Sequence, residues 1–189
     1  MEKPIRSQAT RDRILAEAKR LFGEGGYDRT TIRAVATAAD IHPSMVMRYF
    51  GSKEGLFAAA ADFDLRLPDL RRVPPGERGR ALVRHFLDRW EGAGSGGDLP
   101  ALLRLAATHE PARARMLDVF RHQVVPAIAV ITSPAGAAER AALIGTQLIG
   151  LAFARYVLKL PPIVALDPRD IEDNVGKVVQ AHLDADSPD

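Results

Sequence analysis

Two short helical segments joined by a tight turn constrain this chain of 189 residues more than any other feature of its sequence. Apolar residues recur at helical spacing over residues 32–39 and mark one face of a short helix that must stop near Asp40. After two further turn residues, Pro43 occupies the first position of a second helix, where its missing N–H costs nothing, and Val46 and Phe50 lie one turn apart. A pair of this kind is the unit that places its second helix in the major groove of DNA.

Further helices are expected on both sides of this pair. We expect a first helix that Thr10 caps and that Gly25-Gly26 ends, and we expect Thr30 to cap the first helix of the pair. Another helix, capped by its first residue, should cover Ser52–Leu67 and stop before Pro68. The apolar residues that define the buried faces of these flanking helices are Ile14, Leu15, Ala18, Leu21, Phe22, Leu56, Phe57, Ala60 and Phe63.

The rest of the chain is also predicted to be helical, so the expected fold class is all-α. Runs of alternating β-branched residues, which are typical of strands, are missing, and alanine and leucine dominate. Pro126 should kink or divide the helix that contains it. The helices expected after Pro68 cover residues 77–90, 100–108, 112–131, 135–160 and 168–183. We therefore expect a three-helix DNA-binding domain over residues 1–57, a linking helix over about 52–67 and a helical bundle over 68–189.

Composition excludes several other kinds of protein. Hydrophobic residues make up 47% of the chain, enough to bury a core, and the absence of cysteine excludes disulfides, thiolate metal sites and cysteine catalysis. It also fits a reducing cytoplasm. Residues 1–13 lack the apolar core of a signal peptide, and the longest nearly apolar stretch, residues 141–154, is interrupted by Gln147 and too short to cross a bilayer. We expect a cytoplasmic protein with no membrane segment.

The charge is distributed unevenly along the chain. Residues 1–60 hold ten Lys and Arg against seven Asp and Glu, whereas the remaining residues hold sixteen against seventeen. A modestly basic head on a nearly neutral body suits a DNA-binding protein with a separate second function. The alternative is a chance asymmetry on a solvated surface, and charge alone does not decide between the two.

The second helix of the pair carries the residues expected to face DNA. Its outer side presents Ser44, Met45, Met47, Arg48 and Tyr49. Arg48 is the strongest candidate for a base contact, because a guanidinium pairs with O6 and N7 of guanine. Lys53, at the start of the next helix, should reach a phosphate. Arg33, on the exposed side of the preceding helix, either reaches a groove edge or is simply solvated.

These segments resemble a known family. Thr30–Arg33 with Ala36, then Asp40-Ile41, then Arg48–Phe57, are similar to the DNA-binding domain of TetR-type regulators. The resemblance covers about 50 residues and implies an all-helical homodimer, usually a repressor, whose variable body binds a small molecule and whose two late helices form a four-helix dimer interface. The DNA-binding residues are then expected to be Thr31, Arg33, Pro43, Ser44, Met45, Met47, Arg48, Tyr49 and Lys53.

The chain also departs from the family pattern at several positions. Asp40 replaces the usual turn glycine, a change that we expect to be tolerated because Asp adopts left-handed backbone angles. His42 stands where a capping serine is usual and should be a poorer cap, so that Pro43 must do more to set the start of the helix. Met47 replaces a phosphate-contacting tyrosine, and Tyr49 stands where histidine is common. Met45 and Met47 either contact thymine methyl groups or simply pack.

Two further motifs suggest chemistry that their context does not support. Residues 92–97 match the G-x-G-x-x-G pattern of dinucleotide sites, but no strand precedes them and no βαβ unit surrounds them. His109-Glu110 begins like a zinc-protease helix, yet Pro111 interrupts it and Arg113 stands where the second histidine is needed. The other histidines lack ligand spacing. We therefore expect no metal, no cofactor and no enzyme activity.

The family resemblance directs attention to two sets of residues in the body. Aromatic and apolar residues that could line a ligand cavity, beside polar groups such as His85, His122 or Arg104, are Phe86, Trp90, Leu103, His109, Met116 and Phe120. Small and apolar residues of the two late helices that could form the dimer interface are Gly145, Thr146, Ile149, Gly150, Phe153, Ile171, Val175 and Val178. The alternative for the first of these helices is burial within its own chain.

The resulting hypothesis is a homodimeric repressor that binds a palindromic double-stranded DNA operator and is released by a small-molecule effector. The helix predicted over residues 52–67 would be the lever between the ligand site and the DNA-binding head. One alternative keeps DNA binding but makes the protein an activator, or a repressor that needs its ligand as corepressor. A remote alternative is a small nucleotide-binding enzyme with a basic head.

Overall fold

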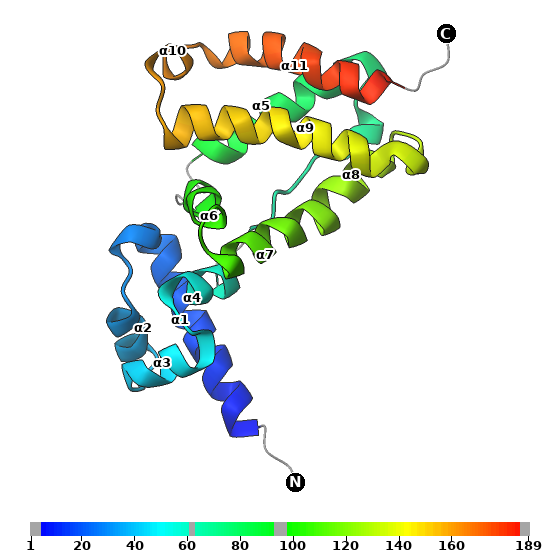
Figure 1. Ribbon diagram of the computed structural model, residues 1–189. Helices are drawn as coiled ribbons and strands as arrows, with labels where there is room; N and C mark the ends of the chain where they lie inside the picture. Colours follow the sequence, from blue (N-terminus) through cyan, green and yellow to red (C-terminus); the bar gives the residue numbers. More distant parts are fainter. Residues whose placement is uncertain (1–4, 61–62, 93–97, 186–189) are drawn as a thin grey trace. The chain divides into compact units, whose positions relative to one another are not determined.

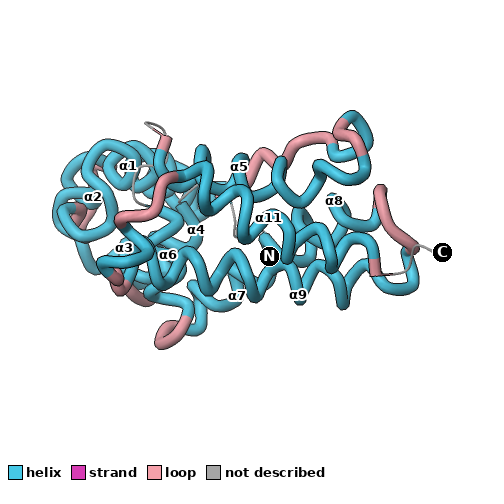
Figure 2. The backbone as a smooth tube through the Cα atoms, turned by 90° about the horizontal axis from the view of Figure 1, so that it is seen from above, coloured by secondary structure: helices cyan, strands magenta, loops and turns pink. Residues whose placement is uncertain are grey.

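The computed structural model describes residues 5–60, 63–92 and 98–185, and within these ranges the chain is helical with short turns and contains no strand (Figures 1 and 2). The all-α prediction is confirmed. The chain divides into two compact units, one made of residues 1–63 and 95–116, the other of residues 64–94 and 117–189. The expected division into two consecutive domains therefore differs from the structure, because residues 95–116 belong to the first unit.

The first unit is built around a cluster of aromatic rings. Phe57 lies at its centre and makes edge contacts with Phe22, Tyr27 and Phe63, with ring centroids 5.1, 5.0 and 5.5 Å apart. Three of these rings, those of Phe22, Phe57 and Phe63, are fully buried. The helices of the unit are α1 (Ile5–Arg29), α2 (Ile32–Ala38), α3 (Pro43–Phe50), α4 (Lys53–Ala60), α6 (Asp98–Ala106) and the first part of α7 (Glu110–Val119).

Two predicted caps in this unit are wrong. α1 begins at Ile5, so Thr10 lies inside the helix rather than at its start, while the expected end is marked by Gly26 with φ 71°. Thr30 is buried, and its hydroxyl donates to the carbonyl oxygens of Leu21 and Gly26 at 3.0 and 2.9 Å. Thr31 caps α2 instead, by accepting a hydrogen bond from the Ala34 N–H at 3.1 Å.

The helix predicted over residues 52–67 is also shorter than expected. α4 ends at Ala60, and the described chain resumes at Phe63 without regular secondary structure up to Asp69, with Arg66 at φ 50°. We call residues 64–67 the connector. Its backbone bonds to side chains of the second unit: the Leu65 N–H donates to Gln123 Oε1 at 2.7 Å. These partners are distant in sequence, which explains why local helix signals failed to predict the end of α4.

The second unit packs its helices α5, α8, α9 and α11 against one another, with α11 lying along α5 and contacting α9 (Figure 1). The close approach of α5 and α11 occurs at two glycines, Gly79 and Gly176, where backbone meets backbone. Arg84 and Glu172 form an ion pair across the same pair of helices at 3.0 Å. The helical elements of the second unit are η1 (Leu70–Arg72), η2 (Pro75–Glu77), α5 (Arg78–Glu91), η3 (Phe120–Val124), α8 (Val125–Ala129), η4 (Pro134–Gly136), α9 (Ala137–Ala152), η5 (Phe153–Val157), α10 (Pro161–Val164) and α11 (Pro168–Asp184).

Pro126 divides its helix, as predicted. The expected helix over residues 112–131 appears as α7, the π-helical turn η3 and α8. Pro126 lies in the first turn of α8, so that its missing N–H and its bulky ring fall where the wider π turn interrupts the regular hydrogen bonds. The short helix α10, between Leu160 and Ala165, was not predicted.

Candidate nucleic-acid interface

The start of α3 is set by the turn that precedes it. Asp40 has φ 50°, which confirms that it adopts the left-handed conformation expected at the glycine position. His42 does cap the helix: its Nδ1 accepts from the Ser44 N–H at 3.3 Å and lies 2.8 Å from the Ser44 hydroxyl. Because Nδ1 accepts here, the ring proton is on Nε2. The substitution of the family's serine is thus compensated by His42 itself, which was expected to be a poor cap.

One side of α3 is buried and the other is open. Val46 is completely buried and anchors the helix on the core of the first unit. Ser44, Met47 and Arg48 are exposed, and Met47 is 44% exposed despite being apolar. Met45 and Tyr49 are half-buried, so their contribution to a reading surface is smaller than their position in the sequence suggests.

Two arginines have guanidinium groups that are free to meet a ligand. Arg33 on α2 and Arg48 on α3 are both exposed, and neither forms a hydrogen bond or ion pair with the residues that the structure describes. A guanidinium carries five N–H donors in a planar fork, a geometry that matches a guanine edge or a phosphate. These two side chains are the cationic groups best suited to contact DNA.

Lys53 is held at the start of α4 by the aromatic cluster. Its ammonium group lies 4.2 Å from the centroid of the Tyr27 ring and donates to the Asp28 carbonyl at 3.4 Å. The Tyr27 hydroxyl donates to Glu54 Oε1 at 2.7 Å, which lowers the pKa of the Glu54 carboxyl, while burial and this carboxylate raise the pKa of Tyr27. Since an ammonium has three donors, Lys53 keeps N–H groups for a phosphate.

All nine residues expected to contact DNA belong to the first unit, on α3 or at the starts of α2 and α4. Thr31 is exposed and its oxygen already serves the α2 cap, so only its hydroxyl hydrogen remains to reach a phosphate. Pro43 is at the first position of α3, as predicted. His42 caps α3, at the position where the sequence predicted a cap poorer than serine.

α3 is a short helix with a capped first turn, a buried inner face and an exposed arginine on its outer face, and α2 precedes it across a tight turn. This arrangement defines a helix-turn-helix DNA-binding domain. Comparison with known families agrees. Residues 14–60 match the family "Bacterial regulatory proteins, tetR family", and residues 76–183 match "Tetracyclin repressor-like, C-terminal domain". The chain belongs to the TetR family of transcription regulators.

Curated relatives resemble about a third of the chain. The chain is 44% identical over 70 residues to the HTH-type transcriptional regulator TcmR of Streptomyces glaucescens, a match that covers 36% of this chain and 31% of TcmR. It is 38% identical over 63 residues to the HTH-type transcriptional repressor AcnR of Corynebacterium efficiens, covering 33% of this chain and 32% of AcnR. The matches therefore span about a third of the length of these relatives.

Solved structures resemble the chain along nearly its whole length. A TetR-family regulator from Streptomyces coelicolor A3 is 27% identical, with a TM-score of 0.54, and the match covers 97% of this chain and 99% of that one. The multidrug binding protein EbrR, solved in complex with proflavin, is 23% identical, with a TM-score of 0.61 and coverage of 92% and 99%. The second likeness supports the fold.

The residues predicted to bind a ligand are divided between the two units. Phe86 and Trp90 line a pocket of about 80 Å³ in the second unit, which we call the α5 pocket. Leu103, His109 and Met116 belong to the first unit, where Leu103 is buried, and they are not among the residues that line this pocket. Of the six candidates, only Phe86 and Trp90 line the α5 pocket, and a role of the others in ligand binding stays a prediction.

The α5 pocket is lined by both aromatic and polar side chains of α5. Trp90 stacks on Tyr156 with centroids 5.1 Å apart and lies 5.3 Å from the ring of Phe86. His85 and Arg89, one turn apart on α5, line the same pocket. Tyr156 was not predicted; burial, and then the hydrogen bond of its hydroxyl to Glu91, raise its pKa. Phe120 instead lies next to Gly145 of α9, 3.9 Å from the position of a Cβ on that glycine.

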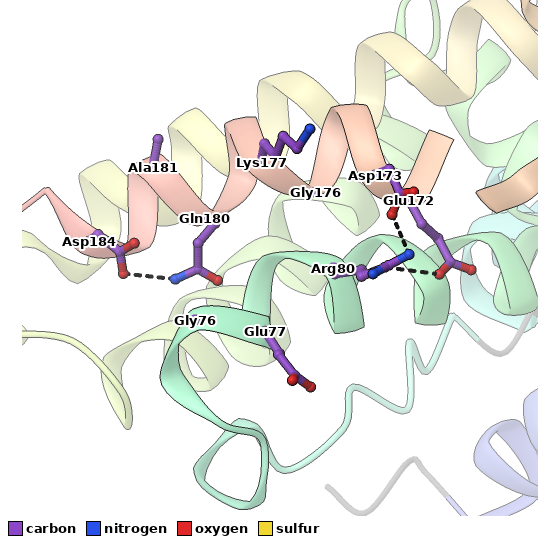
Figure 3. Close-up of a pocket in the computed structure, with 10 residues that line it drawn as sticks. All are labelled: Gly76, Glu77, Arg80, Glu172, Asp173, Gly176, Lys177, Gln180, Ala181 and Asp184. Carbon is purple, nitrogen blue, oxygen red and sulfur yellow. Dashed lines mark hydrogen bonds and ion pairs between the residues drawn. The ribbon is translucent and has the colours of Figure 1, made fainter. Parts of the chain in front are cut away.

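A larger hollow of about 420 Å³ lies along α5 and α11 (Figure 3). Its walls carry side chains that already pair with one another: Arg80 with Glu172 and Asp173, and Gln180 with Asp184. The Arg80 ion pairs join α5 to α11, whereas the bond between Gln180 and Asp184 lies within α11. Gln180 also accepts from the Gly79 N–H across the helix pair. We interpret this hollow as a structural groove, because Arg80 and Gln180 are engaged across the helix pair.

Part of the predicted dimer surface is exposed. Ile149 of α9, Phe153 at the start of η5 and Val178 of α11 are 47%, 40% and 43% exposed, and the space beside Gly150 is open. Ile171 is 1% exposed, so its assignment to a dimer interface is wrong: the side chain fills the core of its own chain. Gly145 and Val175 are half-buried, and Thr146 is exposed.

The structure provides no site at the other motifs that the sequence suggested, within the described residues. Within the described ranges, no three His, Asp or Glu side chains lie close enough together to hold a metal ion, and His109 Nδ1 is 2.8 Å from the Thr108 hydroxyl. The glycine run begins at Gly92, the residue that follows α5, but its other members lie outside the described residues. No helix in the described part of the chain is both long and apolar enough to span a membrane.

Proposed function

We propose that this protein is a ligand-responsive transcriptional repressor that binds a palindromic operator as a homodimer and leaves it when a small molecule binds the second unit. The observation that carries the proposal is α3, whose capped first turn and exposed Arg48 suit the major groove. Membership of the TetR family supports it, as does the similarity of about a third of the chain to TcmR, a transcriptional regulator, and AcnR, a transcriptional repressor. The target is chromosomal DNA, so the protein would work in the cytoplasm.

Replacing single cations should test how α3 and α4 meet DNA. Arg48→Ala should relax specificity at one base pair by about 1–3 kcal/mol, because a bidentate base contact is lost. Lys53→Ala should weaken binding to all sequences alike and reduce the slope of log affinity against log salt by about one, because one phosphate contact is lost. Fluorescence anisotropy with duplexes selected from a random library measures both effects.

The matched control is Arg121→Ala, which removes an exposed arginine of the second unit. It should bind the selected duplex like the parent. Parental affinity, specificity and salt slope in both the Arg48 and Lys53 variants would show that α3 and the start of α4 do not meet DNA as proposed.

The dimer would form through α9 and α11. The exposed apolar residues Leu143 and Ile149 of α9 and Phe153, which follows directly on α9, would be covered by the same surface of a second copy, as a twofold axis requires. Gly150 lies among them with open space beside it, so a partner helix can approach its backbone closely.

An arginine at Gly150 should therefore separate the protomers. Gly150→Arg places a charged side chain where two helices are expected to touch, so sedimentation velocity should report monomers where the parent sediments as a dimer. Gly76→Arg, at another glycine with open surroundings, is the control and should remain dimeric. If the Gly150→Arg protein sediments like the parent, α9 is not part of the dimer interface.

The effector would enter the α5 pocket. Its lining is mostly apolar, and its aromatic side chains together with His85 and Arg89 suit a molecule with an apolar body and one polar group. EbrR, the structural neighbour solved with proflavin, supports ligand binding by a body of this fold.

A further inference from the structure

The connector is held by two side chains of α5 that also line the α5 pocket. Arg89 Nε and Nη2 both donate to the carbonyl oxygen of Asp64, at 3.2 and 3.0 Å. His85 Nε2 lies 2.8 Å from the carbonyl oxygen of Leu65, and because a carbonyl only accepts, this nitrogen carries the ring proton. The cationic and donor groups of the pocket are thus engaged by backbone carbonyls of the connector.

The connector also forms part of the pocket wall. Leu65 and Leu67 line the pocket together with Phe86 and Trp90. The cavity of about 80 Å³ is well below the roughly 300–1,000 Å³ of sites that enclose a drug-sized ligand. A ligand larger than a few atoms therefore fits only if part of the wall moves. The connector is the part of the wall that is neither helical nor buried in the core.

Arg89 is paired less well than its chemistry allows. It gives two N–H donors to one carbonyl oxygen, and among the residues that the structure describes no carboxylate forms an ion pair with it. A guanidinium fork matches the two oxygens of a carboxylate, and such charge-assisted hydrogen bonds are about twice as strong as bonds between neutral groups. A ligand carboxylate would therefore compete effectively with the Asp64 carbonyl.

We propose, as a refinement that rests on the function proposed above, that the effector is an amphipathic carboxylate and that it acts by exchanging partners. Its carboxylate replaces the carbonyl oxygens of Asp64 and Leu65 as the hydrogen-bond acceptor of Arg89 and His85. Its apolar body occupies the space lined by Phe86 and Trp90. The connector is released in the same step. The first segment of the DNA-binding unit ends at residue 63, and the connector begins at residue 64. Release of the connector therefore changes the covalent link that leads to the DNA-binding unit.

Trp90 is the only tryptophan in the chain and lines the pocket, so its fluorescence reports occupancy without a label. The probes are decanoate, below its micelle concentration, and decan-1-ol, which has the same chain length without the charge. Decanoate should change Trp90 emission with at least a tenfold lower dissociation constant than decan-1-ol, in line with one charge-assisted contact. At saturation, decanoate should lower the affinity of the protein for its selected duplex at least tenfold.

Two variants separate the steps. Arg89→Met keeps the apolar stem and loses the guanidinium; it should bind both probes equally, and without any probe it should bind DNA as weakly as the decanoate-bound parent. Arg89→Lys keeps the charge but loses the fork, and should retain only part of the preference for decanoate. Arg121→Met, which removes an exposed arginine outside the pocket, should behave like the parent in every titration.

Each outcome decides a separate point. Equal affinities for decanoate and decan-1-ol in the parent, or an undiminished preference in Arg89→Met with a native circular dichroism spectrum, would overturn the ligand class. Tight decanoate binding with unchanged DNA affinity would overturn the release of the connector. Failure of the ligand-free parent to bind any duplex would instead refute the proposed function, and the Trp90 titration would still stand as a test of the site.

Discussion

Phe57→Ala should destabilise the DNA-binding unit by about 3–5 kcal/mol, the usual cost of removing a buried phenylalanine. Phe57 is fully buried and touches the rings of Phe22, Tyr27 and Phe63, so the alanine leaves a cavity at the point where α1 and α4 meet. Typical domains unfold at a cost of only about 5–15 kcal/mol, so a large part of the stability of the unit would be lost. Urea denaturation followed by circular dichroism measures the change.

The variant also has a functional consequence. Lys53 is positioned by Tyr27, whose ring packs on Phe57, so disorder in this cluster should reduce DNA affinity even at temperatures where helix content is retained. Phe57→Leu is the control: it keeps most of the volume and should cost less than about 1.5 kcal/mol. An alanine variant whose unfolding free energy lies within about 0.5 kcal/mol of the parent's would contradict the central position of this ring.

Gly79→Ala should destabilise the second unit by about 3 kcal/mol, although alanine is the better helix former by about 1 kcal/mol. A Cβ at this position would lie 2.4 Å from the carbonyl oxygen of Gly176 and 2.6 Å from the backbone nitrogen of Gln180. Both atoms belong to the backbone of α11, which faces α5 in Figure 3, so the two helices would have to separate. Such a separation would also stretch the hydrogen bond from the Gly79 N–H to Gln180 Oε1, now 2.8 Å.

Trp90, near the end of α5, makes this loss measurable by fluorescence during urea denaturation. The control is Gly76→Ala, one turn earlier, where no atom lies within 4 Å of the new Cβ, and it should leave the denaturation midpoint nearly unchanged. Helix propensity alone predicts that Gly79→Ala raises the midpoint. A raised midpoint would therefore show that α5 and α11 do not pack as closely as described.

Local signals in the sequence predicted most of the helices. The prediction of a helix over 168–183 agrees with α11 (Pro168–Asp184), and the predicted start of α3 at Pro43 is confirmed. These helices begin with a proline in the first turn, a signal that acts within a few residues and does not depend on the rest of the fold. For the same reason Asp40 could be assigned its left-handed conformation from the sequence.

Predictions failed where a residue type suits two different structural roles and the choice between them depends on contacts with residues distant in the sequence. Thr30 and Thr31 are both capable caps, and the choice between them was decided by the carbonyl oxygens of Leu21 and Gly26, which bind the Thr30 hydroxyl. Ile171 is apolar and suits either a partner or its own core, and the packing of α11 on α5 placed it in the core.

The helix-turn-helix of residues 32–50 illustrates what the sequence by itself determined. Helix spacing, a tight turn and Pro43 act over a few residues, and together they predicted the class of protein and its family. Only the tertiary structure decided where α4 ends, which predicted ligand residues share a pocket, and which side chains hold the connector. Those features depend on hydrogen bonds such as that between Leu65 and Gln123, whose partners are 58 residues apart, and no local pattern records such a pairing.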